Sequence, residues 1–423
     1  MNRLVAALLP ERLGTSFRWL VASSWTTNLA DGISIAGGPL LVASLTRDPF
    51  LISLAALLSW APPLVFGLSA GVLSDRYDRR RILVAANAFR VVVLAGLVTT
   101  ILSGAVTAGW TLLALGLLAS AKVFADNTSV TLAPTLVRRE DLATANARLQ
   151  TGLITLNQLV GPPIGAALFV AGRAFPFLGE SLLVVAGTLL VTRIVLPTVG
   201  AGQPDQDRNL RRDIVEGFRW TARHAAVRTL VLTILIFNVT FGAAWSILVL
   251  YARQRLGLGS VGFGLLTTLG AAGGLVGTGL YGALTRRVSL GNIMRAGLIG
   301  ETLTHLGLAL TTSAWVASGI FFVFGAHAFI WGTTSITVRQ RAVPIHLQGR
   351  VTSVNTICVY AGLVAGSAIG GALATRFGVT APFWFAFGGS ALFVLLLWRE
   401  LRHIAHTDSE PIPAAAEAAT ASP

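Results

Sequence analysis

Charged side chains inside long apolar stretches are the residues of this sequence most able to do chemistry. Asp31 is such a residue, and Asn28, Gly32 and Ser34 add polar or flexible positions around it. A charge near the centre of a bilayer costs at least about 2.5–3.5 kcal/mol, so it requires a function or a partner. Because a medium of low dielectric constant favours the protonated carboxyl, an isolated Asp31 can take up and release a proton. We interpret Asp31 as a proton carrier and cation-binding acid, with polar packing or helix bending as the alternative role.

Arg90, Lys122 and Asp126 form a second charged group. Lys122 and Asp126 are four residues apart, which places them one turn apart on a helix. At 1.5 Å per residue, Arg90 and Asp126 reach similar depths on neighbouring apolar stretches. We predict an Arg90–Asp126 or Lys122–Asp126 ion pair that neutralises charge and ties two helices together, rather than a role in transport.

Glu301 and His305 lie on one face of another apolar stretch, and His327 lies near the middle of the next. They are candidates for a proton relay, with packing as the alternative, whereas Glu180 receives no assignment. A metal site needs further ligands at suitable spacing, so the sequence predicts neither a metal nor another cofactor. No nucleophile–base pair or glycine-rich phosphate loop lies outside the apolar stretches, which argues against an enzyme.

The composition indicates that lipid is the solvent of these segments. The chain has 423 residues, of which 54% are hydrophobic and 12% are charged, and its mean hydropathy is +0.72. Soluble proteins contain roughly 25% charged residues. The net charge of +14 is spread over short basic clusters between apolar runs, which is typical of cytoplasmic loops and not of a nucleic-acid surface.

The apolar stretches predict an all-α membrane protein of twelve transmembrane helices, since one span needs about 20 mainly apolar residues. The expected spans are 18–45, 50–74, 82–103, 110–137, 146–171, 175–196, 229–250, 261–284, 290–311, 314–337, 351–373 and 380–398. We expect six-helix bundles at 1–196 and 229–402, joined by a cytoplasmic linker at 197–228 that carries a surface helix. The tail at 403–423 is expected to be disordered.

The Lys and Arg residues predict the orientation of the spans. If both termini are cytoplasmic, 25 of the 32 basic residues lie in cytoplasmic segments, 5 lie outside and 2 lie within spans. Such an excess on the cytoplasmic side is typical of membrane proteins. We therefore expect a multi-pass protein of the cytoplasmic (inner) membrane.

The two halves of the chain also resemble each other. The segment 161–168 matches 366–373 at five of eight positions, and Gly71-Val-Leu before one arginine cluster corresponds to Gly282-Ala-Leu before another. The offsets are 205 and 211 residues. The pattern predicts two pseudo-symmetric bundles with a binding site between them.

The segment Gly71-Val-Leu-Ser-Asp-Arg-Tyr-Asp-Arg-Arg-Arg-Ile-Leu83 resembles the signature loop of the major facilitator superfamily, between helices 2 and 3. Asp78 stands where that pattern usually has glycine. This variant resembles the drug-exporter branch that includes macrolide efflux proteins and the enterobactin exporter. The segments 145–149, 216–220 and 339–353 are similar to the same branch.

The resemblance implies that Gly71, Asp75, Arg76, Arg79 and Arg80 belong to a latch that holds the two halves together when the transporter is open to the outside. The charge of Asp75 can interact with the positive N-terminal end of helix 11, an interaction of about 0.3–1 kcal/mol. The arginines can bind the anionic inner leaflet. The alternative is that the cluster only sets topology.

Gly161, Pro162 and Gly165 resemble the helix 5 motif of antiporters, although Asn157 and Ala166 stand where that motif has glycine. Proline removes a backbone hydrogen bond and kinks a helix, and glycines permit close helix contact. The resemblance therefore implies a kinked helix 5 and gives modest support for exchange transport.

Taken together, these features predict proton-coupled export of small amphipathic molecules or drugs across the cytoplasmic membrane by alternating access. The alternative is a dedicated exporter of one endogenous metabolite, such as a siderophore or an antibiotic. The expected partners are a small-molecule substrate, protons and the lipid bilayer, with no nucleic acid, and a monomer suffices for this fold.

Overall fold

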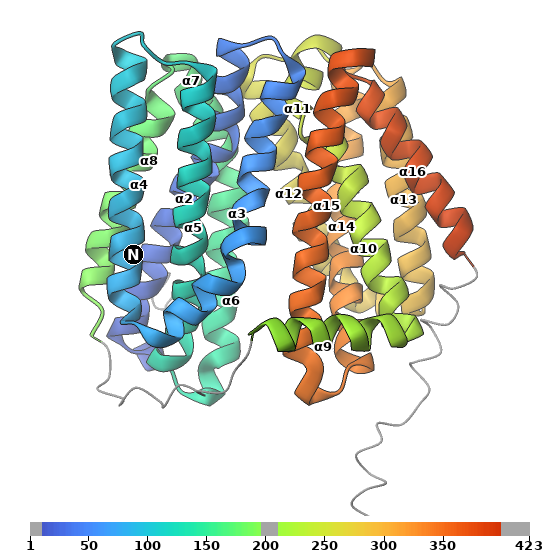
Figure 1. The fold of residues 1–423 in the computed structure, drawn as a ribbon, viewed down its shortest axis with the longest axis horizontal. Coiled ribbons are helices and arrows are strands. Elements are labelled where there is room, and N and C mark those ends of the chain that lie inside the picture. The colour runs from blue at the N-terminus through green and yellow to red at the C-terminus, as the bar shows by residue number, and fades with distance from the viewer. Residues whose placement is uncertain (1–10, 196–209, 399–423) are drawn as a thin grey trace, which may run out of the picture.

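The computed structural model describes residues 11–195 and 210–398, and the elements within these ranges are helices (Figure 1). Ten segments of the described chain are long and apolar enough to cross a membrane. The 21-residue α13 and the 17-residue α16 occupy the remaining two predicted spans. The predicted all-helical membrane fold is confirmed, and helices of the described chain lie at all twelve predicted spans, ten of which are within segments long and apolar enough to cross a membrane.

The N-half comprises the spans that precede the linker. Its helices are α2 (Thr15–Leu45), α3 (Pro49–Arg76), α4 (Arg79–Leu102), α5 (Ala108–Leu136), the composite fifth span α6 (Leu142–Gly152), η3 (Leu153–Val160) and α7 (Gly161–Ala171), and α8 (Phe175–Thr192). Short polar caps begin several of them. The Asp48 side chain, for example, accepts a hydrogen bond from the backbone N–H of Phe50 at the start of α3.

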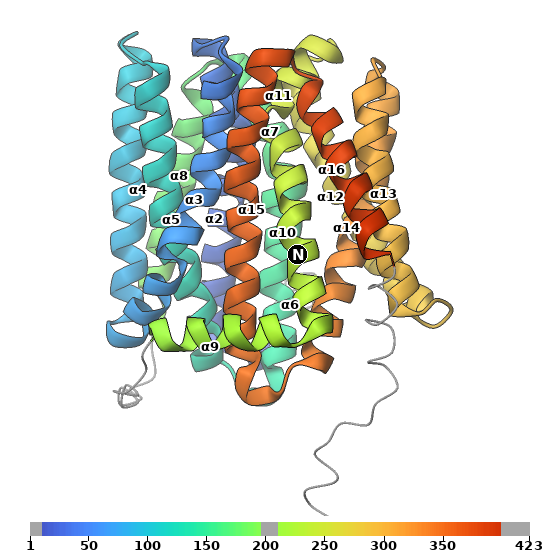
Figure 2. The same ribbon diagram turned by 45° about the vertical axis from the view of Figure 1, so that its right-hand side comes forward.

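The C-half follows the linker helix α9 (Leu210–Arg223). Its helices are α10 (Ala225–Trp245) with the short α11 (Leu248–Leu250) and η4 (Tyr251–Arg255), then α12 (Ser260–Thr285), α13 (Leu290–Leu310), α14 (Ala314–Ala342), α15 (Gln348–Phe377) and α16 (Ala381–Leu397). Figure 2 shows α4 and α13 at opposite edges of the molecule, with α3 and α15 adjacent between them.

The halves are joined by packing at one end, which the predicted topology places outside and which we call the outer end. A continuous apolar core there combines Leu40 and Ile52 of the N-half with Leu248 and Phe263 of the C-half. Arg253 of η4 also donates a hydrogen bond to the Ala43 carbonyl oxygen at 3.3 Å. The outer end is therefore sealed by contacts between the halves.

The first span, α2, and the composite fifth span (α6, η3 and α7) approach each other backbone to backbone at Gly32, Gly161 and Gly165. A Cβ atom on Gly32 of α2 would lie 2.6 Å from the Asn157 carbonyl oxygen, and one on Gly165 would collide with the Ile33 carbonyl. The helix passes from the π-helical η3 to the α-helical α7 at Gly161-Pro162, where proline cannot donate the next backbone hydrogen bond. Gly161, Pro162 and Gly165, which resemble the antiporter motif, thus lie where the fifth span crosses α2 at close distance.

The linker helix α9 lies across the inner end of the C-half in both views (Figures 1 and 2). Arg350 at the start of α15 forms ion pairs with Asp213 at 2.9 Å and Glu216 at 2.7 Å. Gly217 lets the α9 backbone approach the Arg350 carbonyl. The predicted bundle boundaries near 197 and 402 and the tail at 403–423 lie outside the described residues and stay predictions.

The Gly165→Ala substitution should destabilise the protein, although alanine has the higher helix propensity. Its methyl group would press on the backbone of Ile33, and overpacking of this kind costs about 1–3 kcal/mol. The loss of stability is measured as a lower midpoint of thermal unfolding in detergent, with size-exclusion chromatography to quantify the protein that remains folded. Gly388→Ala on α16, where a Cβ meets no neighbour, is the matched control and should be at least as stable as wild type. Equal stability of both variants would contradict the tight crossing.

Candidate functional site

Five charged residues from four helices of the N-half form one contact network, which we call the N-half charge cluster. Arg90 of α4 forms an ion pair with Asp31 of α2, and the same Arg90 nitrogen lies 3.3 Å from a carboxylate oxygen of Glu180 on α8. The Lys122 ammonium on α5 lies 2.7 Å from Asp31 and 2.6 Å from Asp126. Lys122 thus bridges two carboxylates.

Solvent exposure changes steadily along the N-half charge cluster. The side chains of Arg90, Glu180 and Asp31 are buried, whereas Lys122 is 34% exposed and Asp126 is 60% exposed. Lys122 therefore connects the buried members of the cluster to an accessible carboxylate, Asp126.

The structure changes two of the sequence expectations for these residues. The structure contains the Lys122–Asp126 ion pair, but this pair lies within α5 and does not tie two helices together as predicted, and Arg90 contacts Asp31 and Glu180 instead of Asp126. The expectation of an isolated Asp31 is wrong, because two long basic side chains, Arg90 of α4 and Lys122 of α5, reach it across the bundle. Glu180 is a cluster member that the sequence interpretation missed. A lone glutamate within an apolar helix was the available signal.

The N-half charge cluster contains three carboxylates and two basic groups. The buried carboxylates Asp31 and Glu180 are matched in number by Arg90 and Lys122, so the surplus negative charge falls on the exposed Asp126. A proton bound by one carboxyl group can neutralise this surplus, and so can an additional cation near Asp126. The arrangement can therefore exchange a proton for another positive charge.

A second ionisable cluster lies in the C-half. His305 Nε2 lies 3.0 Å from one carboxylate oxygen of Glu301 on α13, and His327 of α14 lies 3.8 Å from the other. The Trp245 ring packs edge-on against His305, and Phe324 packs likewise against His327. Glu301 and His305 are buried, as a proton relay or a packing role would allow. No group of three potential metal ligands is found among the described residues.

The two ionisable clusters lie on matching helices of the halves. α4 begins 290 − 79 = 211 residues before α13, and α5 begins 314 − 108 = 206 residues before α14. Glu301 therefore corresponds to Arg90, whereas His327 lies one position from the match of Lys122. The C-half thus has a carboxylate where the N-half has Arg90, and a histidine near the level of Lys122.

The signature loop is anchored to its own half through the side chains that the structure describes. Arg79 donates to the Thr131 carbonyl at 3.2 Å and Arg80 to the Thr192 carbonyl at 2.6 Å, near the C-terminal ends of α5 and α8. Cations are stabilised at such helix ends. Asp78 caps α4 by accepting from the backbone N–H groups of Arg80 and Arg81, which accounts for the aspartate at a usual glycine position.

The predicted latch across the halves stays a prediction. The backbone of α3 runs through Asp75 and Arg76, but their side chains lie outside what the structure describes. A Cβ on Gly71 would meet no neighbour, so close packing does not require glycine there.

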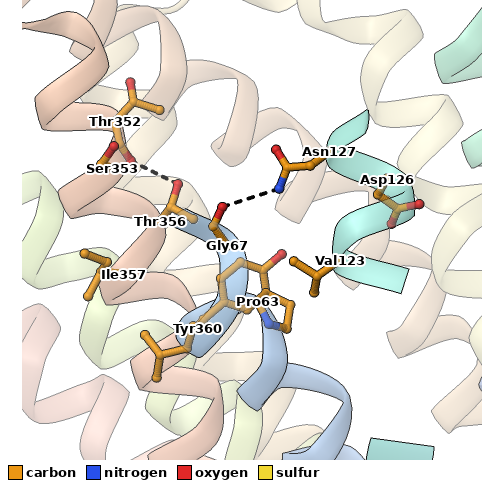
Figure 3. A pocket seen from close by; sticks show the side chains of 11 residues that line it. Pro63, Gly67, Val123, Asp126, Asn127, Thr352, Ser353, Thr356, Ile357 and Tyr360 are labelled. Atoms are coloured by element: carbon orange, nitrogen blue, oxygen red, sulfur yellow. Dashed lines mark hydrogen bonds between the residues drawn. The ribbon is translucent and has the colours of Figure 1, made fainter. Parts of the chain in front are cut away.

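A cavity of about 300 Å³ opens between the halves beside Asp126 (Figure 3). Its walls are α3, α5 and α15, with Pro63 and Gly67, Asp126 and Asn127, and Tyr360 among the lining residues. The cavity therefore joins the exposed end of the N-half charge cluster to a helix of the opposite half.

Comparisons with known proteins identify the family of the chain. Residues 6–419 match the family model described as transmembrane secretion effector. The chain is 27% identical over 386 residues to the multidrug efflux pump Tap of Mycolicibacterium fortuitum, covering 86% of this chain and 90% of the relative. It is 23% identical over 366 residues to macrolide efflux protein A of Streptococcus pyogenes (83% and 87%) and 25% identical over 364 residues to the enterobactin exporter EntS of Salmonella typhimurium (85% and 84%).

Solved structures show the same fold at low sequence identity. The nucleoside transporter NupG superposes with a TM-score of 0.73 at 10% identity, covering 91% of this chain and 100% of NupG. A bacterial homologue of the iron transporter ferroportin, solved in an inward-facing state, superposes with a TM-score of 0.73 at 16% identity, covering 91% and 98%. These likenesses establish the fold alone.

Removing the buried Arg90 guanidinium should lower the stability of the protein more than removing the exposed guanidinium of Arg138. Arg90→Leu leaves Asp31 and Glu180 unpaired in the interior, and losing one partner of a buried ion pair costs about 3–5 kcal/mol. We expect a sharp drop in folded, monodisperse protein. Adding Asp31→Asn and Glu180→Gln to this variant should restore part of the yield. Arg138→Ala, at an 82% exposed side chain, is the control and should match wild type. An Arg90→Leu variant as stable as this control would exclude the pairing.

Proposed function

Because the chain belongs to the transmembrane secretion effector family of the major facilitator superfamily, we propose that it exports small amphipathic molecules or drugs by proton-coupled alternating access. The chain is a multi-pass membrane transporter of an efflux family rather than an enzyme. The substrate, the proton coupling, the direction and the cytoplasmic placement of both termini are parts of the proposal. The arginine distribution supports the orientation.

The surplus carboxylate of the N-half charge cluster carries the proposal of proton coupling. Asp31, Glu180 and Asp126 share two cations, Arg90 and Lys122. A bound proton neutralises the surplus, and its release leaves a site for other positive charge. Because these groups come from four helices, a change of protonation alters contacts throughout the N-half, and this can bias the orientation of the two halves.

The sealed outer end supports the first step of an export cycle. The halves are packed together at the outer end, and the cavity beside Asp126 is lined by residues near the inner end of α15, such as Thr352 and Ser353, so the arrangement favours entry of substrate from the inner side. Separation of the outer contacts would then release the substrate and admit protons from outside. Proton binding to the N-half charge cluster, centred on Asp31, would favour the return to the inward-facing arrangement.

The C-half cluster is a second candidate for proton coupling. Glu301 and His305 of α13 are in direct contact and buried, and His327 extends the contact to α14. A carboxyl–imidazole pair can pass a proton between its members. We assign it the secondary role because His305 and His327, unlike Arg90 and Lys122, can balance Glu301 only when they are protonated.

A dedicated exporter of one endogenous metabolite, such as a siderophore or an antibiotic, is the alternative. The similarity to the enterobactin exporter favours it, whereas the similarities to macrolide and multidrug efflux proteins favour broader export. Both alternatives use the same cycle and differ in substrate range.

Efflux of a fluorescent cation from pump-deficient cells tests the proposal. Wild type should lower the dye content, and either a protonophore or Asp31→Asn should abolish this activity. Asp31→Asn removes one of the carboxylates that a proton can neutralise. Glu140→Gln, at a 72% exposed side chain, is the control and should transport like wild type.

The other outcomes of this experiment are equally informative. Protonophore-sensitive efflux by Asp31→Asn would move the coupling acid to another residue, with Glu301→Gln as the next variant. Efflux by wild type that is insensitive to the protonophore would contradict proton coupling. Absence of dye efflux by wild type would favour the dedicated exporter.

A further inference from the structure

Asp126 differs from the other carboxylates of the N-half charge cluster in its access to the cavity. Its side chain is 60% exposed, whereas those of Asp31 and Glu180 are buried. Asp126 lines the cavity together with residues of α3 and α15. A ligand in this cavity can therefore reach Asp126 without entering the packed interior.

The cavity extends from the inner surface towards the middle of the membrane. Thr352 lies four residues into α15, about 6 Å from its inner end, and Tyr360 lies twelve residues in, about 18 Å. Asp126 lies ten residues from the inner end of α5, about 15 Å deep. The carboxylate thus stands in the deep part of a cavity that opens to the inner side.

We propose that Asp126 binds a monovalent organic cation, and that Lys122 is an internal competitor which the cation displaces towards Asp31. The inference rests on the proposed export function and names the substrate class of that site. Lys122 contacts both carboxylates, at 2.6 and 2.7 Å. When a cation occupies Asp126, Lys122 therefore keeps a partner, and no buried charge is left unpaired.

The charge balance of the cluster favours a cation over other ligands. The three carboxylates exceed the two basic groups by one negative charge when all five are ionised. A monovalent cation brings the sum to zero, whereas an anion would raise the surplus to two. Since electrostatic interactions are stronger at low dielectric constant, this difference is felt more in the cavity than in water.

The remaining cavity wall suits an amine with an apolar body. The hydroxyl groups of Ser353 and Thr356 donate to carbonyls of their own helix, so their oxygens remain free to accept hydrogen bonds. Pro63, Val123 and Ile357 supply apolar surface, as Figure 3 shows. Acceptors beside a carboxylate complement a ligand whose N–H groups carry positive charge.

Equilibrium binding to purified protein tests the inference without any ion gradient. The probe is rhodamine 6G, a fluorescent cation with N–H groups, and fluorescein is the matched anion with the same ring system. Fluorescence anisotropy in detergent should show binding of rhodamine 6G and much weaker binding of fluorescein. Asp126→Asn should weaken rhodamine 6G binding at least about tenfold, which corresponds to about 1.4 kcal/mol.

The Lys122→Gln variant separates competition from a structural ion pair. If Lys122 competes with the ligand, its removal should tighten rhodamine 6G binding, so the two variants move the Kd in opposite directions. If the pair only stabilises the fold, both variants should weaken binding together and lower the thermal unfolding midpoint. Asp126→Glu should retain binding, and Glu140→Gln should match wild type.

Three results would overturn the inference: absence of cation binding by wild type, unchanged binding by Asp126→Asn, or weaker binding by Lys122→Gln in folded protein. Protonophore-sensitive efflux of a neutral dye alongside any of these would leave the proposed export function standing. The expected shifts in Kd combined with protonophore-insensitive efflux in cells would instead retain the cation site and reject proton coupling.

Discussion

The requirement that charges inside the membrane be neutralised governs the arrangement of the N-half. Arg90 is buried among apolar helices and meets this requirement with carboxylates from α2 and α8, while Lys122 does so with Asp31 and Asp126. These contacts join α2, α4, α5 and α8. A helix that carries one member of the network cannot rotate or slide alone, because its charge would lose its partner at a cost of several kcal/mol. Movements that preserve the contacts therefore move these four helices together.

Close packing of glycines complements this electrostatic requirement. Gly32 follows Asp31 directly, and at Gly32 the α2 backbone packs against η3 of the fifth span. The same turn of α2 is thus held by charge on one face and by backbone contact on another. Thr268 of α12 donates a hydrogen bond to the Leu159 carbonyl in η3 of the fifth span, so this crossing also contacts the C-half. Asp31 is adjacent to Gly32, which packs on this part of the fifth span. A change in the charge of Asp31 can therefore affect the interface between the halves.

The sequence predicts those features that depend on local spacing and on solvent. Long apolar runs place the spans, basic clusters predict their orientation, and four-residue spacing predicts the Lys122–Asp126 pair. The contacts of Arg90 with Asp31 and Glu180 join residues 59 and 90 positions apart. Residue counting gives the depth of each side chain but not the direction in which its helix faces. Charges at equal depth could therefore be identified as candidates, whereas their partners required the packed structure.

The pseudo-symmetry of the halves extends to the positions of their ionisable groups but not to their charge. Arg90 corresponds to Glu301 at the offset of 211 residues between α4 and α13, and His327 of α14 lies one position from the match of Lys122 on α5. Arginine and lysine keep their charge at physiological pH, so a mobile proton or a ligand can balance only the surplus carboxylate of the N-half. The C-half also needs a bound proton for neutrality, because its histidines balance Glu301 only when they are protonated. The exposed carboxylate that lines the cavity belongs to the N-half, at Asp126, which is why the proposed cation site lies on that wall.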